Sequence, residues 1–213
     1  MAGTTKTDHA LERLVFFSDA VFAIAITLLV IEIRIPELPK GSSDVAHLHA
    51  LKMLIPSFVG YVISFALVGL FWIGHHRAFA LADRYSAKVL GSNMLLLGAI
   101  AFMPFATAYY THNVNQRVPA MFYCGVLSLA ALLNLLVVWT ATGPNMASPH
   151  ADAEELALAR RRNVVVALGA LTALAATAVS PKNGPLGLTT IILWDRLCRL
   201  RPLNRRGRTG TSQ

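Results

Sequence analysis

A carboxylate inside a long apolar stretch is the first group in this sequence that could do chemistry. Asp19 follows Ser18 within a largely apolar run from Leu14 to Ile33. An ionised carboxylate near the centre of a bilayer costs about 2.5–3.5 kcal/mol on insertion scales, so Asp19 needs a partner. Trp72 and His76 lie four residues apart, on one face of a helix, and both can donate hydrogen bonds. We expect them to be the partners of Asp19.

Two kinds of chemistry are open to these residues. Asp19 and His76 could exchange protons, as titratable pairs in membrane carriers do, or they could simply join two helices. His75 beside His76 leaves a metal or proton site as an alternative. His47 and His49 have the spacing of metal ligands, but no third ligand lies nearby, so we expect a solvated loop and no metal site. No motif typical of hydrolases, metalloproteases or phosphate-binding enzymes occurs, so we predict no catalytic residue and no cofactor.

The composition is that of an all-α integral membrane protein. Hydrophobic residues make up 55% of the chain and charged residues 14%, and the mean hydropathy is +0.54. The net charge of +8 could suggest nucleic acid, but the basic residues follow the positive-inside rule instead. With six spans and a cytoplasmic N-terminus, the basic residues on the cytoplasmic side are Lys6, Arg13, Arg77, Arg84, Lys88, Arg160, Arg161, Arg162, Arg196, Arg199, Arg201, Arg205, Arg206 and Arg208. The opposite side has Arg34, Lys40, Lys52, Arg117 and Lys182.

The apolar segments predict one six-helix transmembrane domain over residues 11–200. The spans are expected at about 14–35, 53–74, 88–109, 119–140, 164–179 and 186–200. A polar cytoplasmic segment, 1–10, precedes them, and a basic cytoplasmic tail, 201–213, follows. We expect the tail to meet anionic lipid headgroups and not nucleic acid. Ser148 followed by Pro149 predicts the start of a cytoplasmic helix that leads into the fifth span.

Within the spans, polar and small residues are expected to join helices. Val59, Gly60 and Tyr61 resemble a fragment of a potassium-filter loop, but the flanking threonine and the final glycine of that loop are missing, so no such loop is predicted. Gly60 and Gly69 instead favour close helix packing, and Asn93 favours an interhelical hydrogen bond.

The first span has a second feature, an apolar stripe with one hydroxyl. At 100° per residue, its four members fall on one face of a helix, about 140° around the axis from Asp19. The stripe consists of Ile24, Thr27, Leu28 and Ile31. Such a stripe can face lipid, a neighbouring helix or a shared axis.

Several of these residues together resemble a known family. Arg13, Phe17, Ser18 and Asp19 form an R-x-x-x-F-S-D pattern followed by AVFAIAITLLVIEI, and Trp72 and His76 form a Trp-x-x-x-His pair. The combination resembles the first two helices of the transmembrane protein 175 family, the endosomal and lysosomal potassium channel and its prokaryotic relatives. The resemblance implies a homotetramer in which helix 1 of each subunit lines a central pore.

The resemblance also implies roles for individual residues. Ile24, Leu28 and Ile31 correspond to the apolar constriction that acts as gate and selectivity element, and Thr27 to a hydroxyl position next to it. Arg13, Phe17, Ser18 and Asp19 correspond to the signature that fastens helix 1 to its neighbours, with Trp72 and His76 as contacts.

We therefore expect a potassium-permeable channel of limited selectivity in the cell membrane, with potassium as the permeant ion. A proton-coupled secondary transporter that uses Asp19 and His76, and a membrane scaffold without transport, remain the alternatives.

Overall fold

Helices make up the regular structure of the described chain. The computed structural model describes residues 6–84, 86–180 and 190. The helices are α1 (Lys6–Ile31), α2 (Asp44–Met53), α3 (Ile55–Ala80), α4 (Ala87–Thr111), α5 (Arg117–Ala141) and α6 (Ala153–Val179). All but α2 are long and apolar enough to cross a membrane, which gives 5 spans among the described residues. The prediction of an all-α integral membrane protein is confirmed. The sixth predicted span, 186–200, lies outside the described residues except for residue 190, and residues 1–5 and the basic tail also lie outside them.

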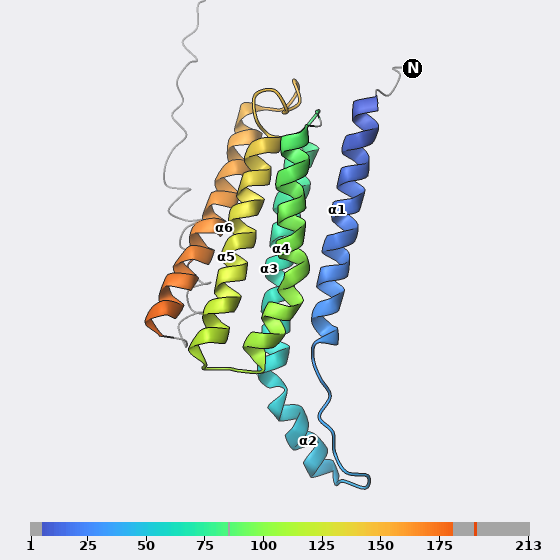
Figure 1. Ribbon diagram of the computed structural model, residues 1–213, viewed down its shortest axis with the longest axis vertical. Coiled ribbons are helices and arrows are strands. Elements are labelled where there is room, and N and C mark those ends of the chain that lie inside the picture. Colours follow the sequence, from blue (N-terminus) through green and yellow to red (C-terminus); the bar gives the residue numbers. More distant parts are fainter. Residues whose placement is uncertain (1–5, 85, 181–189, 191–213) are drawn as a thin grey trace, which may run out of the picture.

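The long helices stand side by side and alternate in direction (Figure 1). α3, α4, α5 and α6 form a packed group, and α1 lies at one edge of it against α3 and α4. The start of α1 shares one end of the bundle with the α3–α4 and α5–α6 connections. The short helix α2 projects beyond the opposite end.

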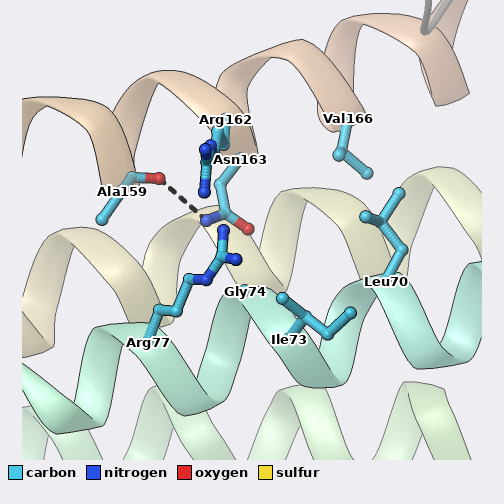
Figure 2. Close-up of a pocket in the computed structure, with 8 residues that line it drawn as sticks. All are labelled: Leu70, Ile73, Gly74, Arg77, Ala159, Arg162, Asn163 and Val166. Atoms are coloured by element: carbon cyan, nitrogen blue, oxygen red, sulfur yellow. Dashed lines mark hydrogen bonds between the residues drawn. The ribbon is translucent and has the colours of Figure 1, made fainter.

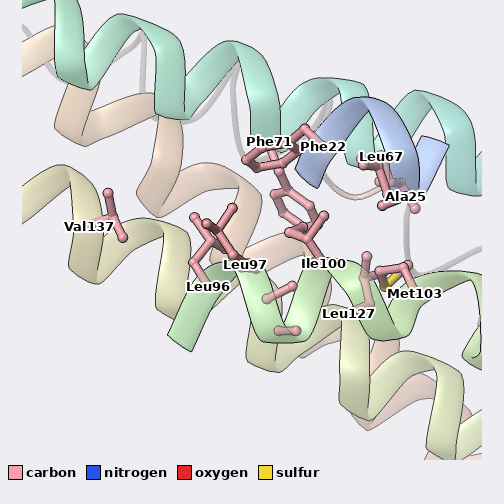
Figure 3. Packing of buried hydrophobic residues seen from close by; sticks show 14 of the residues in the cluster. Phe22, Ala25, Leu67, Phe71, Leu96, Leu97, Ile100, Met103, Leu127 and Val137 are labelled. Carbon is pink, nitrogen blue, oxygen red and sulfur yellow. The ribbon is translucent and has the colours of Figure 1, made fainter. Parts of the chain in front are cut away.

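The core of the bundle is a continuous cluster of apolar side chains (Figure 3). Phe22 from α1 and Phe71 from α3 pack with Leu96 and Ile100 of α4 and with Leu127 of α5, and all five are nearly inaccessible. Because lipid is as apolar as these side chains, close packing and hydrogen bonds, more than hydrophobic burial, hold such helices together.

The predicted loop around His47 and His49 is wrong, because these residues lie on helix α2. The side chain of Ser43 caps the helix by accepting a hydrogen bond from the Ala46 amide at 3.3 Å. Asp44 in the first turn and Lys52 in the last turn complement the helix dipole. These local charges and the cap form a helix where the pattern of prolines and serines favoured a loop.

The predicted helix start at Ser148 is also wrong. The cap of α6 is Asp152, whose carboxylate accepts a hydrogen bond from the Glu154 amide at 3.2 Å. Ser148 lies in the preceding turn, where its amide donates to the Leu81 carbonyl at 2.9 Å. The expected cytoplasmic helix and the fifth span are therefore one helix of 27 residues.

Two span boundaries also differ from the prediction. α3 continues past residue 74 to Ala80, because Ala78 and Phe79 are buried and no helix breaker precedes Leu81. α1 ends at Ile31, four residues before the predicted end at Ile35. Pro36 disfavours helical backbone at the residue before it, and the chain leaves the helix ahead of that point.

Close packing depends on one of the two predicted glycines. A Cβ atom on Gly60 would lie 2.1 Å from Cγ2 of Thr111 on α4, whereas a Cβ on Gly69 would meet nothing within 4 Å. The expected packing role is therefore confirmed for Gly60, whereas Gly69 makes no close helix contact within the described chain. Gly60 lies at the point where α3 and α4 approach each other closely.

We predict that G60A and G69A change stability in opposite directions. Overpacking at Gly60 should lower the free energy of unfolding by about 1–3 kcal/mol, because the hydroxyl of Thr111 is already hydrogen-bonded to Ala108 and holds its rotamer. G69A gains up to about 1 kcal/mol of helix propensity with no contact to lose. Thermal unfolding in detergent measures both, and a G60A variant as stable as G69A would contradict the close approach.

Candidate functional site

Asp19 accepts a hydrogen bond from α3. The indole Nε1 of Trp72 donates to Oδ1 of Asp19 at 2.8 Å, so the expected contact between these two residues is present. The ring of His76 stacks on Trp72, with centroids 5.4 Å apart. Among the hydrogen bonds of the described residues, none joins His76 to Asp19. His76 therefore supports the donor instead of bonding the carboxylate.

A second series of hydrogen bonds begins at Ser18, the residue before Asp19, and is fully buried. Asn93 of α4 donates from Nδ2 to the Ser18 hydroxyl at 2.9 Å, and Ser18 donates to the Leu14 carbonyl at 2.7 Å. The Oδ1 atom of Asn93 lies 2.8 Å from Nε2 of His75 on α3. Because Oδ1 can only accept, Nε2 of His75 carries the proton. The series thus joins α3, α4 and α1 in that order.

Sequence reasoning predicted the role of Asn93 in joining helices but missed that of His75. His75 is completely buried, between the rings of Phe22 and Phe79, with centroid distances of 5.4 and 4.6 Å. Its neighbour His76 is exposed, so two adjacent histidines have opposite environments. The available signal was the helical spacing. His75 lies four residues after the buried Phe71, whereas His76 lies four after the half-exposed Trp72.

These contacts fix how α1 is rotated about its own axis. Within the described residues, the side-chain hydrogen bonds from α1 to other helices come from Ser18 and Asp19 alone. In an apolar setting, the groups of a broken bond have no water to replace their partner, so rotation of α1 is disfavoured. We call Ser18, Asp19, Trp72, His75 and Asn93 the anchor of α1.

The stripe residues lie on the side of α1 away from the bundle. Ile24 is 58% exposed, Leu28 39% and Ile31 69%, and Thr27 is also exposed. The buried side of the same helix carries Phe22, Ala25 and Leu29. We call the exposed side the free face of α1.

The free face extends toward the start of the helix. Arg13 and Phe17 are exposed and lie at multiples of about one helical turn from Ile24. The R-x-x-x-F-S-D residues therefore divide into two pairs. Ser18 and Asp19 bond within the subunit, whereas Arg13 and Phe17 point away from it.

Thr27 supplies the free face with one polar atom. Its hydroxyl lies 3.0 Å from the Ala23 carbonyl and 2.9 Å from the Ile24 carbonyl, so its proton is used within the helix. The oxygen retains acceptor capacity. A cation close to this face would meet a hydroxyl oxygen between apolar side chains.

No metal centre is formed among residues 6–84 and 86–180. In this part of the chain, no three His, Cys, Asp or Glu side chains come together in a way that could hold a metal ion. His47 and His49 are exposed on α2.

Known proteins resemble this chain over the region that holds these features. The family described as the endosomal/lysosomal potassium channel TMEM175 matches residues 13–104, which include the anchor and the free face. A protein of Chamaesiphon minutus named as a potassium channel is 38% identical over 148 residues, which are 68% of this chain and 72% of that protein. One of Streptomyces collinus, also named as a potassium channel, is 35% identical over 165 residues, 75% of this chain and 77% of that protein.

The fold has a counterpart among solved structures. The crystal structure of a lysosomal potassium-selective channel TMEM175 homolog from Chamaesiphon minutus superposes with a TM-score of 0.75 at 28% identity, over 89% of this chain and 98% of that one. Sequence and fold agree on the same group of proteins. This chain belongs to the TMEM175 family.

Proposed function

We propose that this protein is a potassium-permeable channel of the cell membrane, with a pore formed by the free face of α1 from four identical subunits. The observation that carries the proposal is the exposure of Ile24, Leu28 and Ile31 on the side of α1 opposite the bundle. The relatives named as potassium channels support the class of function.

The free face must be covered by lipid or by other subunits. Two features favour subunits. The anchor fixes the rotation of α1, which a helix that merely contacts fluid lipid does not need. Thr27 also adds a hydroxyl to the face, and threonine is one of the residues that are enriched at interfaces between membrane helices. A closed ring of identical subunits would bring these faces to a common axis.

Rings of these side chains would form a hydrophobic constriction. Copies of Ile24 around an axis can exclude water and thereby close the pore, and a permeating ion must shed part of its hydration to pass. Potassium holds its water less strongly than sodium, so the constriction favours potassium modestly. The oxygen of Thr27 can offset some of the lost hydration.

The orientation in the membrane follows from charge. The end of the bundle with Arg77, Arg84 and Arg160–Arg162 is the cytoplasmic end under the positive-inside rule. With a sixth span, both termini lie on that side. The basic residues from Arg196 to Arg208 would then meet anionic headgroups. Each basic residue near the membrane surface contributes about 1 kcal/mol of binding free energy to such an attraction.

A proton-coupled carrier is the second candidate, and the geometry favours it less. Such a carrier needs Asp19 and His76 to share a proton path. Instead, Asp19 is bonded to Trp72, His76 stacks on the indole, and both stand away from the free face.

Ion flux into liposomes distinguishes these functions. We expect the reconstituted protein to pass potassium faster than sodium, with ohmic single-channel currents in planar bilayers and no need for a pH gradient. Flux that saturates and follows an imposed pH gradient would indicate the carrier instead. Absence of flux would leave a scaffold.

The constriction predicts the effect of polar substitutions on the free face. I24N and L28N should each raise potassium leak and lower the preference for potassium over sodium at least about threefold, equivalent to only about 0.7 kcal/mol of discrimination. V30N is the matched control, because Val30 lies on the same helix, 51% exposed, but off the stripe. Unchanged selectivity in I24N and L28N, or an equal change in V30N, would contradict the pore surface.

The anchor predicts a different result at Asp19. D19A removes the acceptor of the Trp72 indole and should lower the free energy of unfolding by about 1–3 kcal/mol and impair assembly, because a hydrogen bond to a charged group is lost. Size-exclusion chromatography with light scattering measures the oligomer, and flux measures selectivity. W72F should reproduce the loss. D19A oligomers that stay intact but conduct a different ion would place Asp19 in the pore.

A further inference from the structure

A groove between α3 and α6 has two arginines at one end and apolar walls at the other (Figure 2). The space within it that water can enter is about 40 Å³. The lining residues are Leu70, Ile73, Gly74, Arg77, Ala159, Arg162, Asn163 and Val166. A second, more open hollow of about 440 Å³ adjoins it and shares Arg77, Ala159 and Arg162. The groove lies between α3 and α6, whereas the free face belongs to α1, which stands at the other side of the bundle and does not contact α6.

The floor of the groove is built from buried polar groups. Asn163 is 5% exposed, accepts a hydrogen bond from Asn134 of α5 at 2.9 Å and donates to the Ala159 carbonyl at 2.9 Å. A Cβ atom on Gly74 would lie 2.6 Å from Oδ1 of Asn163, so only glycine leaves room for this amide. The Oδ1 atom of Asn134 is buried without a hydrogen-bond partner. These contacts hold α3, α5 and α6 at a fixed separation.

The two arginines bring concentrated positive charge to this floor. Figure 2 shows the ends of Arg77 and Arg162 beside the amide of Asn163, one from each helix. In the part of the chain that the structure describes, the one ion pair joins His9 and Glu12, so no carboxylate lies within 4.0 Å of either guanidinium. Glu155 borders the second hollow and forms no ion pair with another described residue.

Arg160, on the same helix, behaves differently. It donates from Nε to the Thr142 hydroxyl at 3.0 Å and from its Nη2 atom to the Thr142 carbonyl, so it closes the end of α5. Arg77 and Arg162 have no comparable bond within the described residues. Two guanidinium groups placed side by side repel each other unless an anion lies between them, and their planar donor sets match phosphate oxygens.

The groove continues from the arginines along the membrane. Ile73 lies about one turn from Arg77 and Leu70 about two turns, both toward the middle of α3, and Val166 lies one turn beyond Arg162 on α6. Ile73 is 41% exposed, so this wall is open to the surroundings of the bundle. A cationic end at the membrane surface and an apolar channel running inward match the headgroup and acyl chain of one phospholipid.

We infer that Arg77 and Arg162 bind the phosphate headgroup of an anionic phospholipid whose acyl chain lies along Leu70, Ile73 and Val166. Free phosphate would use the arginines but gain nothing from the apolar wall. The proposed site consists of described residues, and the basic tail lies outside them.

Native mass spectrometry of the purified full-length protein in detergent tests the site, with phosphatidylglycerol and phosphatidylcholine as probes. We expect wild type to retain phosphatidylglycerol preferentially and R77Q/R162Q to bind it at least about tenfold more weakly, because charge-assisted hydrogen bonds are lost. R84Q/K88Q is the matched control. It removes two exposed basic residues at the same end that do not line the groove, and should change binding less than about twofold.

Each remaining outcome decides the proposal. Equal losses in the two double variants would reduce the effect to general surface charge and overturn it, as would displacement of the lipid by millimolar inorganic phosphate. If R77Q/R162Q does not fold, R77K/R162K keeps the charge and loses the bidentate geometry. It should then bind phosphatidylglycerol more weakly than wild type, and unchanged binding would overturn the site. Potassium flux in pure phosphatidylcholine vesicles should be unaffected, so failure of this site leaves the channel function untouched.

Discussion

The rotation of α1 about its own axis determines which of its side chains face away from the bundle. Hydrogen bonds of two adjacent residues set that rotation. Ser18 and Asp19 point in directions about 100° apart on α1, so their partners on α4 and α3 hold the helix from two sides. A single bond would allow the helix to pivot, whereas two bonds on different neighbours do not. When Ser18 and Asp19 are held, the helical periodicity places the stripe on the side of α1 that faces away from the bundle. The stripe residues are Ile24, Thr27, Leu28 and Ile31.

Burial makes this arrangement specific. Asn93 and His75 are inaccessible, and Nε2 of His75 and both amide atoms of Asn93 form bonds in a defined order from α3 through α4 to α1. In water, a rotated α1 could exchange these bonds for solvent, but in an apolar interior it would leave unsatisfied polar groups behind. The polar residues in the spans therefore select one packing of helices that apolar contacts alone would accept in several forms. The Ser64, Thr107 and Tyr123 hydroxyls form a similar buried cluster between α3, α4 and α5.

Much of this arrangement was predictable from the sequence because single-helix periodicity determines it. The stripe on α1, its separation from Asp19 and the donor role of Trp72 all follow from residue spacing. The burial of His75 and the exposure of His76 could not be predicted in this way, because they depend on which helices pack against α3. Helix α2 and the start of α6 were missed for another reason. There, single caps at Ser43 and Asp152 outweighed prolines that favoured other boundaries.

The position of the anchor along α1 has a further physical consequence. Both interhelical side-chain bonds of the described α1 lie near its middle, at Ser18 and Asp19, whereas the stripe begins more than one turn later, at Ile24. Beyond the anchor, α1 is held by the apolar contacts of Phe22, Ala25 and Leu29, which have no preferred direction of the kind that a hydrogen bond has. The orientation of Ile24 is thus set closely by Ser18 and Asp19. In the proposed pore, the distance of Leu28 and Ile31 from the shared axis would depend on packing with neighbouring subunits, so the proposed constriction would have a fixed chemistry but a width set by assembly.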